Sequence, residues 1–355
     1  MEQVKTHSSL RTVEWKDNGV VMIDQTKLPN ELVYVTYTDY NDVAQAIRTL
    51  VVRGAPAIGV SGAFGLALAS LQSNAADIKS FLADLETARK ILFETRPTAV
   101  NLKWGLDRIM SLANKKASEN VTIEQLRTLI IDEAKRIAED DIATNKSMGN
   151  FGSELFSDQD TIMTHCNAGA LATVAYGTAL GVIRATKDKG KNIKVIATET
   201  RPVQQGSRLT AFELKHDGID VSLIPDTAVG YTMANKLVNK VVVGADRILR
   251  TGHVYNKIGT YQVATMAKQH GIPFYVAAPL STFDMQSNPD QVVIEMRKGT
   301  EVTGIGDKKT APDDINVINP AFDMTPPELI SGIITEKGVA KPPFEESIKK
   351  LFENN

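Results

Sequence analysis

The chain has a single cysteine, little net charge and no long apolar run. With only Cys166 an intramolecular disulfide is excluded, which fits a reducing compartment. A formal net charge of -2 and a pI of about 6.3 give no excess of basic residues of the kind that nucleic-acid-binding proteins carry. Residues 1–14 are polar, unlike a signal or transit peptide, and no segment approaches the length of a membrane span. We therefore expect a soluble cytoplasmic protein with neither nucleic acid nor a membrane as partner.

Two common site motifs are also missing. No His-x-x-x-His or Cys-x-x-Cys spacing occurs, so nothing in the sequence indicates a metal site. The spacing of Gly59, Gly62 and Gly65 could be mistaken for a dinucleotide fingerprint, but no G-x-G-x-x-G is present. Small residues three apart line one face of a helix, so we attribute these glycines to close helix packing.

The length and the apolar content are enough for two domains. The chain has 355 residues, more than a typical single core holds, and 43% of them are hydrophobic. Near the start, Asn18-Gly19 between the apolar stretches 13–15 and 20–24 predicts a β-hairpin. A strand at 33–38 and helical patterns at 39–51, 57–71, 77–95, 99–113 and 122–155 follow. We expect this half to be mainly helical.

After residue 160 the pattern changes to short apolar strands that alternate with helices. The strand candidates are residues 161–166, 194–199, 221–225, 240–245 and 273–278. Such alternation predicts a parallel sheet with helices on both faces. We place the domain boundary in the polar interval 157–160. The expected fold is α/β, with a Rossmann-like catalytic domain at 157–355 and a smaller, mostly helical domain with a few β-strands at 1–156.

Polar residues follow four of these strands at their carboxyl ends. They are Cys166-Asn167, Glu199-Thr200-Arg201, Asp226-Thr227 and Asp246-Arg247. Because the carboxyl ends of parallel strands share one edge, we expect these residues to converge at a ligand site.

Cys166 and Asp246 are the two candidates for chemistry at this edge. Cys166 precedes a glycine-bearing turn into an alanine-rich pattern, and a helix amino terminus there would stabilise a thiolate or an anionic ligand. Alternatively, the thiol is a small buried hydrophobe. Asp246 in an apolar pocket would have a raised pKa and could donate a proton, or it could be an N-cap or a salt-bridge partner.

Other polar residues could bind the ligand. Gln205 and its neighbours Arg201, Gln204 and Arg208 could hold hydroxyls or phosphate, and Lys257 after Asn256 could neutralise an anion, although both positions also suit solvated surface. Arg53, Gly54 and Ala55 precede Pro56 at a first helical turn, whose amides would form a phosphate cradle or simply a tight turn. Arg96 could reach the same ligand.

Several ordered motifs together resemble the methylthioribose-1-phosphate isomerase family, the aldose-ketose isomerases of methionine salvage. They are Arg-Gly-Ala-Pro-Ala-Ile-Gly at 53–59, Arg-Pro-Thr-Ala-Val-Asn-Leu at 96–102, His-Cys-Asn-Ala-Gly at 165–169, Thr-Arg-Pro at 200–202, Val-Gly-Ala-Asp-Arg at 243–247, Asn-Lys-Ile-Gly-Thr-Tyr at 256–261 and Asn-Pro-Ala-Phe-Asp at 319–323. The fold is shared with ribose-1,5-bisphosphate isomerases and with regulatory subunits of the initiation-factor guanine-exchange complex. Retention of Cys166 and Asp246 disfavours the regulatory group.

The resemblance implies a chemistry and a set of roles. The family substrate is an aldose with phosphate on its anomeric carbon, so its ring cannot open spontaneously. Asp246 would supply the acid for ring opening, and Cys166 would act as base or stabilise charge. The substrate-binding residues would be Arg53, Gly54, Ala55, Arg96, Gln205, Asn256 and Lys257. Hydrogen could move as a proton or as a hydride.

The same resemblance implies no cofactor, no metal and a homodimer. Alternatives are an isomerase of ribose 1,5-bisphosphate or 5-deoxyribose 1-phosphate, or a non-catalytic subunit that binds sugar phosphates or nucleotides. Residues 319–325 could shape either the site or a dimer contact.

Overall fold

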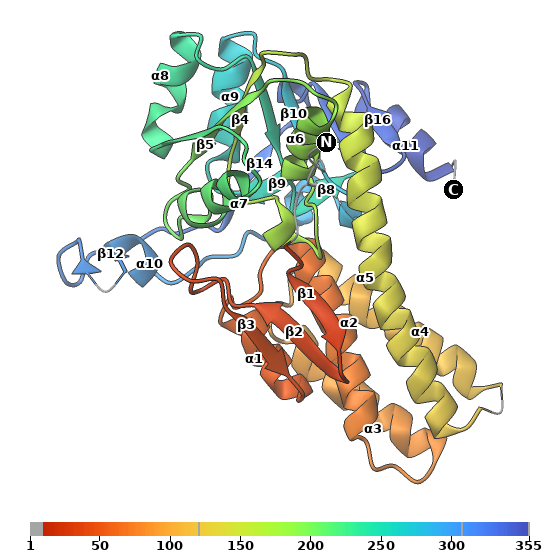
Figure 1. The fold of residues 1–355 in the computed structure, drawn as a ribbon. Coiled ribbons are helices and arrows are strands. Elements are labelled where there is room, and N and C mark those ends of the chain that lie inside the picture. The colour runs from red at the N-terminus through yellow and green to blue at the C-terminus, as the bar shows by residue number, and fades with distance from the viewer. Residues whose placement is uncertain (1–9, 120, 307, 354–355) are drawn as a thin grey trace, which may run out of the picture. The chain divides into compact units, whose positions relative to one another are not determined.

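The computed structural model describes residues 10–119, 121–306 and 308–353 and divides into two compact units (Figure 1). The amino-terminal unit contains the described residues up to Lys146 together with Gly169–Gly177, and the carboxy-terminal unit contains Ser147–Ala168 and the residues from Thr178 onward. Each unit has its own hydrophobic core. The division falls within one long helix, α5 (Ile123–Ser153), that contributes to both units. The domain boundary expected at 156/157 stays a prediction.

The amino-terminal unit is a small antiparallel sheet packed with helices, as predicted. Its elements are β1 (Val13–Lys16), β2 (Gly19–Ile23), β3 (Tyr34–Tyr37), α1 (Tyr40–Arg48), α2 (Ala55–Gln72), α3 (Ile78–Phe93), α4 (Val100–Ala117) and most of α5. The predicted hairpin is confirmed, but its turn residues are Asp17 and Asn18, with φ of 49° and 56°. Gly19 already begins β2.

The apolar helix α2 forms the centre of this unit. By length and composition its 18 residues could cross a membrane, with a mean hydropathy of 1.3, so the expectation that no segment approaches that length is wrong. In the structure 78% of the helix is buried. A Cβ on Gly59 would lie 2.7 Å from the Asn101 carbonyl oxygen, and one on Gly62 would lie 2.7 Å from Leu102. The glycines therefore serve helix packing, as expected.

The carboxy-terminal unit is built on a seven-stranded sheet in the order β16-β15-β10-β7-β4-β5-β6. The strands are β4 (Thr161–Thr164), β5 (Lys194–Thr198), β6 (Val221–Ile224), β7 (Lys240–Val243), β10 (Phe274–Ala277), β15 (Gly332–Thr335) and β16 (Gly338–Ala340), of which only β16 is antiparallel. All five predicted strands are present.

Helices cover both faces of this sheet. Alternate residues of β7 enter different clusters: Val241 and Val243 pack in one, and Val242 packs in the other. Residues of α8 (Val229–Ala234), α9 (Thr260–Gln269) and α11 (Phe344–Glu353) join the first cluster, and residues of α6 (Ala179–Asp188), α7 (Ala211–His216) and the end of α5 join the second. The Rossmann-like expectation is confirmed.

The order in which the strands are laid down places a reversal at the centre of the sheet. From β4 the chain adds β5 and β6 on one side, then returns to add β7, β10 and β15 on the other. β4 and β7 are parallel neighbours, with Ile162 opposite Lys240 and Met163 opposite Val241. In open α/β sheets, ligands bind outside the carboxyl ends of the strands at such a reversal.

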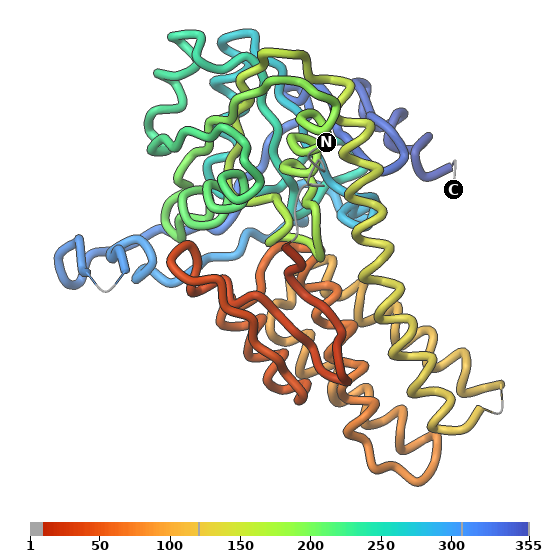
Figure 2. The backbone as a smooth tube through the Cα atoms, viewed as in Figure 1, coloured from red at the N-terminus to blue at the C-terminus, as the bar shows by residue number. Residues whose placement is uncertain are grey.

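A second, smaller sheet lies beside the first and was not predicted. It has the order β11-β8-β9-β14, formed by β11 (Phe283–Asp284), β8 (Arg247–Leu249), β9 (Val254–Lys257) and β14 (Phe322–Thr325). An excursion containing α10 (Thr300–Thr303), β12 (Gly304–Ile305) and β13 (Lys308–Lys309) extends away from the sheets, as the tube in Figure 2 shows. The Arg201 guanidinium donates to the carbonyl of Val302 at 3.0 Å and to that of Gly304 at 3.4 Å, which ties the excursion to the loop after β5.

Close packing at Gly206 provides a test of the fold. A Cβ there would lie 1.7 Å from the Thr198 carbonyl oxygen, so we expect Gly206→Ala to lower the free energy of unfolding by about 3 kcal/mol. Gly230→Ala in α8 is the matched control, because among the described residues the only atom within 4 Å of its Cβ is the sulfur of Met266 at 3.6 Å. Urea unfolding of both variants measures the difference. Equal stability of the two would contradict the packing described.

Candidate active site

Cys166 lies in a tightly held turn at the carboxyl end of β4. The strand ends at Thr164, and Cys166 has a φ of 64°, in the left-handed region that non-glycine residues rarely occupy. Its N–H donates to the Thr200 hydroxyl at 2.9 Å, and its carbonyl accepts from the Thr210 hydroxyl at 2.6 Å. These two bonds from elements after β5 stabilise the unusual conformation. The residue is buried, with 9% of its surface exposed.

The helix expected directly after Cys166 is absent, and this expectation was wrong. Ala170–Ala172 forms a single 3-10 turn, and α6 begins only at Ala179. The carbonyls of this segment bond outside it: Val174 accepts from the Thr12 N–H at 2.8 Å, and Leu171 accepts from the Gln25 side chain at 2.8 Å. Its small residues therefore serve close packing within the amino-terminal unit. No helix amino terminus is available there to stabilise the thiolate.

A buried ionic network supports the Cys166 turn from behind. The Asn167 amide donates to the Glu213 carboxylate at 2.8 Å and to the Thr210 hydroxyl at 3.2 Å. Glu213 in turn accepts from Arg184 at 2.8 Å, and Arg184 also binds Asp217 at 2.6 Å. Arg184 and Glu213 are 0% exposed. Although burial opposes it, the two carboxylates raise the pKa of the Arg184 guanidinium, so the cation remains charged.

Asp246 follows β7 and leads into β8, on the other side of the chain reversal. Its N–H donates to the Tyr255 carbonyl at 2.9 Å, and Arg247 lies opposite Tyr255 in the ladder. Tyr255 thus faces both Asp246 and Arg247, as in a β-bulge, which places the backbone of Asp246 beside β9, one residue along from Asn256. A Cβ on Gly244, between β7 and Asp246, would lie 2.6 Å from the Cβ of Ala168. The loops that carry Cys166 and Asp246 therefore touch.

Residues 319–325 fix the strand that carries Asn256 and Lys257. Phe322 pairs with Lys257 across the ladder, and the Lys257 ammonium lies 4.3 Å from the centre of its ring. The Asp323 carboxylate accepts from the N–H groups of Gly259 at 2.7 Å and Tyr261 at 3.1 Å, at the start of α9. Residues 322–325 thus hold β9 and the start of α9 in place, and a role of this segment in the site stays a prediction.

Gln205 has a buried side-chain oxygen without a hydrogen-bond donor in the described segments. It is 7% exposed, and within the part of the chain that the structure describes its Oε1 is buried with no hydrogen-bond donor. Gln205 directly precedes the π-helical turn Gly206–Thr210, a form that often occurs at functional sites. Asp226, by contrast, has a structural role, because its carboxylate accepts from the backbone amides of Thr200 and Arg201 at 2.8 and 2.7 Å.

The predicted phosphate cradle lies in the amino-terminal unit. Gly54, with φ of 96°, caps α2, which begins at Ala55. A Cβ on Gly54 would lie 2.5 Å from the Cα of Ala172, so no larger residue fits. The Arg53 guanidinium donates to the Gln25 side chain at 3.1 Å, and Gln25 also binds the Leu171 carbonyl. The cradle is therefore packed directly on the Gly169–Gly177 segment.

Arg96, the remaining predicted binding residue, lies in the turn between α3 and α4. Its N–H donates to the Phe93 carbonyl and its carbonyl accepts from Ala99. Sequence patterns did not indicate the Thr210 hydroxyl, the Glu213–Arg184 pair or the contacts of His165. Only Arg184, a charged residue within an apolar helical pattern, could have indicated the buried ionic network from the sequence.

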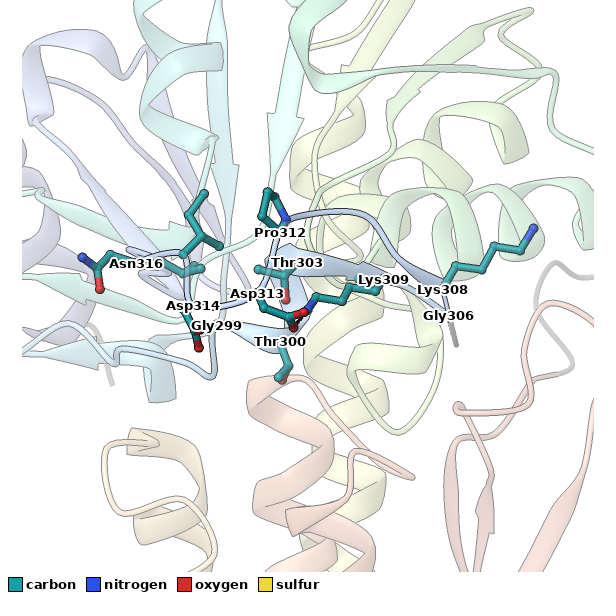
Figure 3. A pocket seen from close by; sticks show the side chains of 13 residues that line it. Gly299, Thr300, Thr303, Gly306, Lys308, Lys309, Pro312, Asp313, Asp314 and Asn316 are labelled. Carbon is teal, nitrogen blue, oxygen red and sulfur yellow. Dashed lines mark ion pairs between the residues drawn. The ribbon is translucent and has the colours of Figure 1, made fainter.

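A pocket of about 660 Å³ lies elsewhere, along the excursion between Gly299 and Val317 (Figure 3). Lys308, Lys309, Asp313 and Asp314 are among its lining residues, and Lys309 and Asp313 form an ion pair. None of the predicted site residues lines it. Among residues 10–119, 121–306 and 308–353 there is also no group of three or more His, Cys, Asp or Glu side chains that could hold a metal ion.

Comparisons with known proteins point to one family. The pattern of the Initiation factor 2 subunit family matches residues 51–342. A methylthioribose-1-phosphate isomerase from Thermosipho africanus (strain TCF52B) is 53% identical, over 96% of this chain and 98% of that protein. The crystal structure of 5-methylthioribose 1-phosphate isomerase from Pyrococcus horikoshii OT3 matches with a TM-score of 0.92 and 45% identity, over 99% and 98% of the two chains. That of translation initiation factor eIF-2B, subunit delta, from A. fulgidus has a TM-score of 0.87 and 48% identity, over 97% and 100%.

Removal of one partner from the buried ion pair behind Cys166 should destabilise the fold strongly. Glu213→Gln leaves the fully buried Arg184 with only one anionic partner, so we expect the free energy of unfolding to fall by about 3 kcal/mol. Glu154→Gln is the matched control, because Glu154 pairs with Lys189 at the exposed surface, and its loss should cost less than about 0.5 kcal/mol. Urea unfolding measures both. A change in Glu213→Gln no larger than that in the control would refute the assignment.

The Asp323 carboxyl should make stability depend on pH. Burial raises its pKa from 3.8 to about 6, against the opposing effect of the Gly259 and Tyr261 amides. The folded state therefore binds the proton more tightly than the unfolded state. The resulting stability is present below about pH 4 and is lost as the pH rises to about 6. Relative to Asp323→Asn, the wild type should lose about 2 kcal/mol over this range in urea titrations. A constant difference between the two proteins would show that the carboxyl titrates normally.

Proposed function

This chain belongs to the Initiation factor 2 subunit family, in its methylthioribose-1-phosphate isomerase branch, and we propose that it converts 5-methylthioribose 1-phosphate into 5-methylthioribulose 1-phosphate. The substrate is a sugar phosphate and the reaction an aldose-ketose isomerisation. The structural observation that carries the assignment of the site is the chain reversal between β4 and β7. Cys166 and Asp246 follow these two strands, and the loops that carry them touch at Ala168 and Gly244.

Cys166 and Asp246 are the proposed catalytic residues. Phosphate on the anomeric carbon prevents spontaneous ring opening, so an acid must protonate the ring oxygen as its bond to C1 breaks. Asp246 supplies this proton. The hydrogen on C2 then moves to C1, and the 2-hydroxyl loses its proton as C2 becomes a ketone, so atoms and charge balance. Cys166 either carries the hydrogen as a base or stabilises charge beside C2.

The proton and hydride routes differ in a measurable way. A proton that passes through Cys166 can exchange with solvent, whereas a hydride that moves directly from C2 to C1 in a dry pocket cannot. Deuterium at C1 of product formed in D2O supports the proton route, and its absence supports the hydride route.

The other proposed residues bind the substrate. Gln205 has a buried acceptor for a sugar hydroxyl, and Asn256 and Lys257 end β9, the strand that pairs with β8 directly after Asp246. Arg53, Gly54, Ala55 and Arg96 provide donors and positive charge for the phosphate.

We further propose that the protein is a cytoplasmic homodimer. One cysteine fits a reducing compartment, and closed twofold assemblies are the commonest among soluble oligomers. Sedimentation at micromolar concentration distinguishes a dimer from a monomer.

A non-catalytic regulatory role is the second candidate. It is favoured by the name of one solved relative, a translation initiation factor subunit at 48% identity. A protein of that kind would bind sugar phosphates or nucleotides without forming ketose. Incubation of the purified chain with 5-methylthioribose 1-phosphate, ribose 1,5-bisphosphate and 5-deoxyribose 1-phosphate separates the candidates. Ketose formed fastest from the methylthio sugar supports the proposal, preference for another sugar identifies a sibling isomerase, and binding without turnover supports regulation.

Replacement of the proposed catalytic residues tests their roles. Cys166→Ser and Asp246→Asn should each lower kcat by about 10²- to 10⁴-fold, the range typical for loss of a proton-transfer group. Asp220→Asn, at an exposed position before β6, is the control and should retain wild-type turnover. Coupled detection of ketose gives kcat, and thermal unfolding verifies that each variant is folded. Near wild-type turnover in a folded variant removes that residue from the mechanism.

A further inference from the structure

His165 is a buried side chain directly beside Cys166 that the proposed chemistry does not use. Only 2% of its surface is exposed. Its Nδ1 lies 2.7 Å from the Thr198 hydroxyl at the end of β5, and its Nε2 lies 2.8 Å from the Ile258 carbonyl between β9 and α9. The ring thus bridges two segments that are far apart in the chain, next to the thiol.

The two partners determine the form of the imidazole. A carbonyl oxygen can only accept, so Nε2 carries the proton and donates to Ile258. Nδ1 is then the acceptor for the Thr198 hydroxyl. Burial lowers the pKa of His165, and the positive charge of Lys257 lowers it further, against the backbone bond to Ile258 and the charge of Asp226. The ring is therefore neutral, with both nitrogens engaged.

Both ends of this bridge are themselves fixed. On one side, a Cβ on Gly259 would lie 2.9 Å from the ring, so the turn after Lys257 packs directly against the imidazole. Asp323 holds the same turn through the Gly259 N–H. On the other side, the Thr198 hydroxyl lies 3.3 Å from the Thr200 hydroxyl, which accepts the N–H of Cys166.

We propose that His165 is a positioning residue that fixes the Cys166 thiol relative to the strand end carrying Asn256 and Lys257. This inference rests on the proposed function, because it assumes that these three residues act on one substrate. The imidazole transfers no proton. It sets a spacing, and an error of about 1 Å in such a spacing can cost about 100-fold in rate.

Three substitutions separate the two hydrogen bonds of the ring. His165→Gln places a donor near the Nε2 position and keeps the bond to Ile258, whereas His165→Asn places an acceptor near Nδ1 and keeps the bond to Thr198. His165→Leu fills much of the space without either bond. His270→Gln, at an exposed position after α9, is the matched control.

Two readouts report on positioning. The first is the split between kcat and KM for 5-methylthioribose 1-phosphate. The second is the rate of alkylation by iodoacetamide, which modifies Cys166 alone because the chain has no other thiol. Alkylation needs no turnover, so it still reports on the thiol if the protein proves not to be an isomerase. A wild type that forms no ketose therefore refutes the proposed function, whereas the alkylation result tests His165.

We expect His165→Leu to lower kcat about 10- to 100-fold, to change KM less than threefold and to change the alkylation rate at least threefold. His165→Gln and His165→Asn should each recover part of the loss, and the control should match the wild type. The proposal is overturned if folded His165→Leu keeps kcat and the alkylation rate within twofold of wild type. It is equally overturned if all three variants fail to fold, because His165 is then a residue of the core.

Discussion

The predicted site depends on one constraint: two threonine hydroxyls hold the backbone amide and carbonyl of Cys166. A non-glycine residue at a φ of 64° costs about 1 kcal/mol or more and persists only where its surroundings enforce it. Thr200 and Thr210 enforce it by taking one backbone group of Cys166 each. Because both threonines follow β5, the direction of the thiol is set by the neighbouring strand rather than by its own.

The support behind this turn is ionic, although the turn itself is held by neutral bonds. The Asn167 side chain donates to the Glu213 carboxylate, and the charge of Glu213 is balanced by the Arg184 guanidinium, which has no exposed surface. A buried charge network of this kind contributes little net stability compared with an apolar core of the same volume, but it tolerates few alternative arrangements. The conformation of Cys166 thus depends on the electrostatic balance within α6 and α7 as well as on the two threonine contacts at the strand ends.

Local patterns in the sequence were sufficient for the main architecture. Strands β4, β5, β6, β7 and β10 are short segments rich in apolar residues, and this is why they could be located. The second sheet could not be found, because β8, β9 and β14 carry charged or polar residues such as Arg247, Asn256 and Asp323 at paired positions. The alanine-rich segment after Cys166 was misassigned because its carbonyls are satisfied by Thr12 and Gln25, partners more than a hundred residues away.

Segment Gly169–Gly177 lies between two parts of the carboxy-terminal unit in the sequence but packs with the amino-terminal unit. The chain leaves the carboxy-terminal unit at Ala168, packs nine residues with the amino-terminal unit, and returns at Thr178. No single cut in the polypeptide separates the two units cleanly, because a fragment that starts at Ser147 would carry this segment without Thr12, Gln25 and Gly54. Neither unit can therefore be isolated intact as one continuous fragment. Recombination between distant relatives within this region would have to exchange segment Gly169–Gly177 together with the rest of the amino-terminal unit.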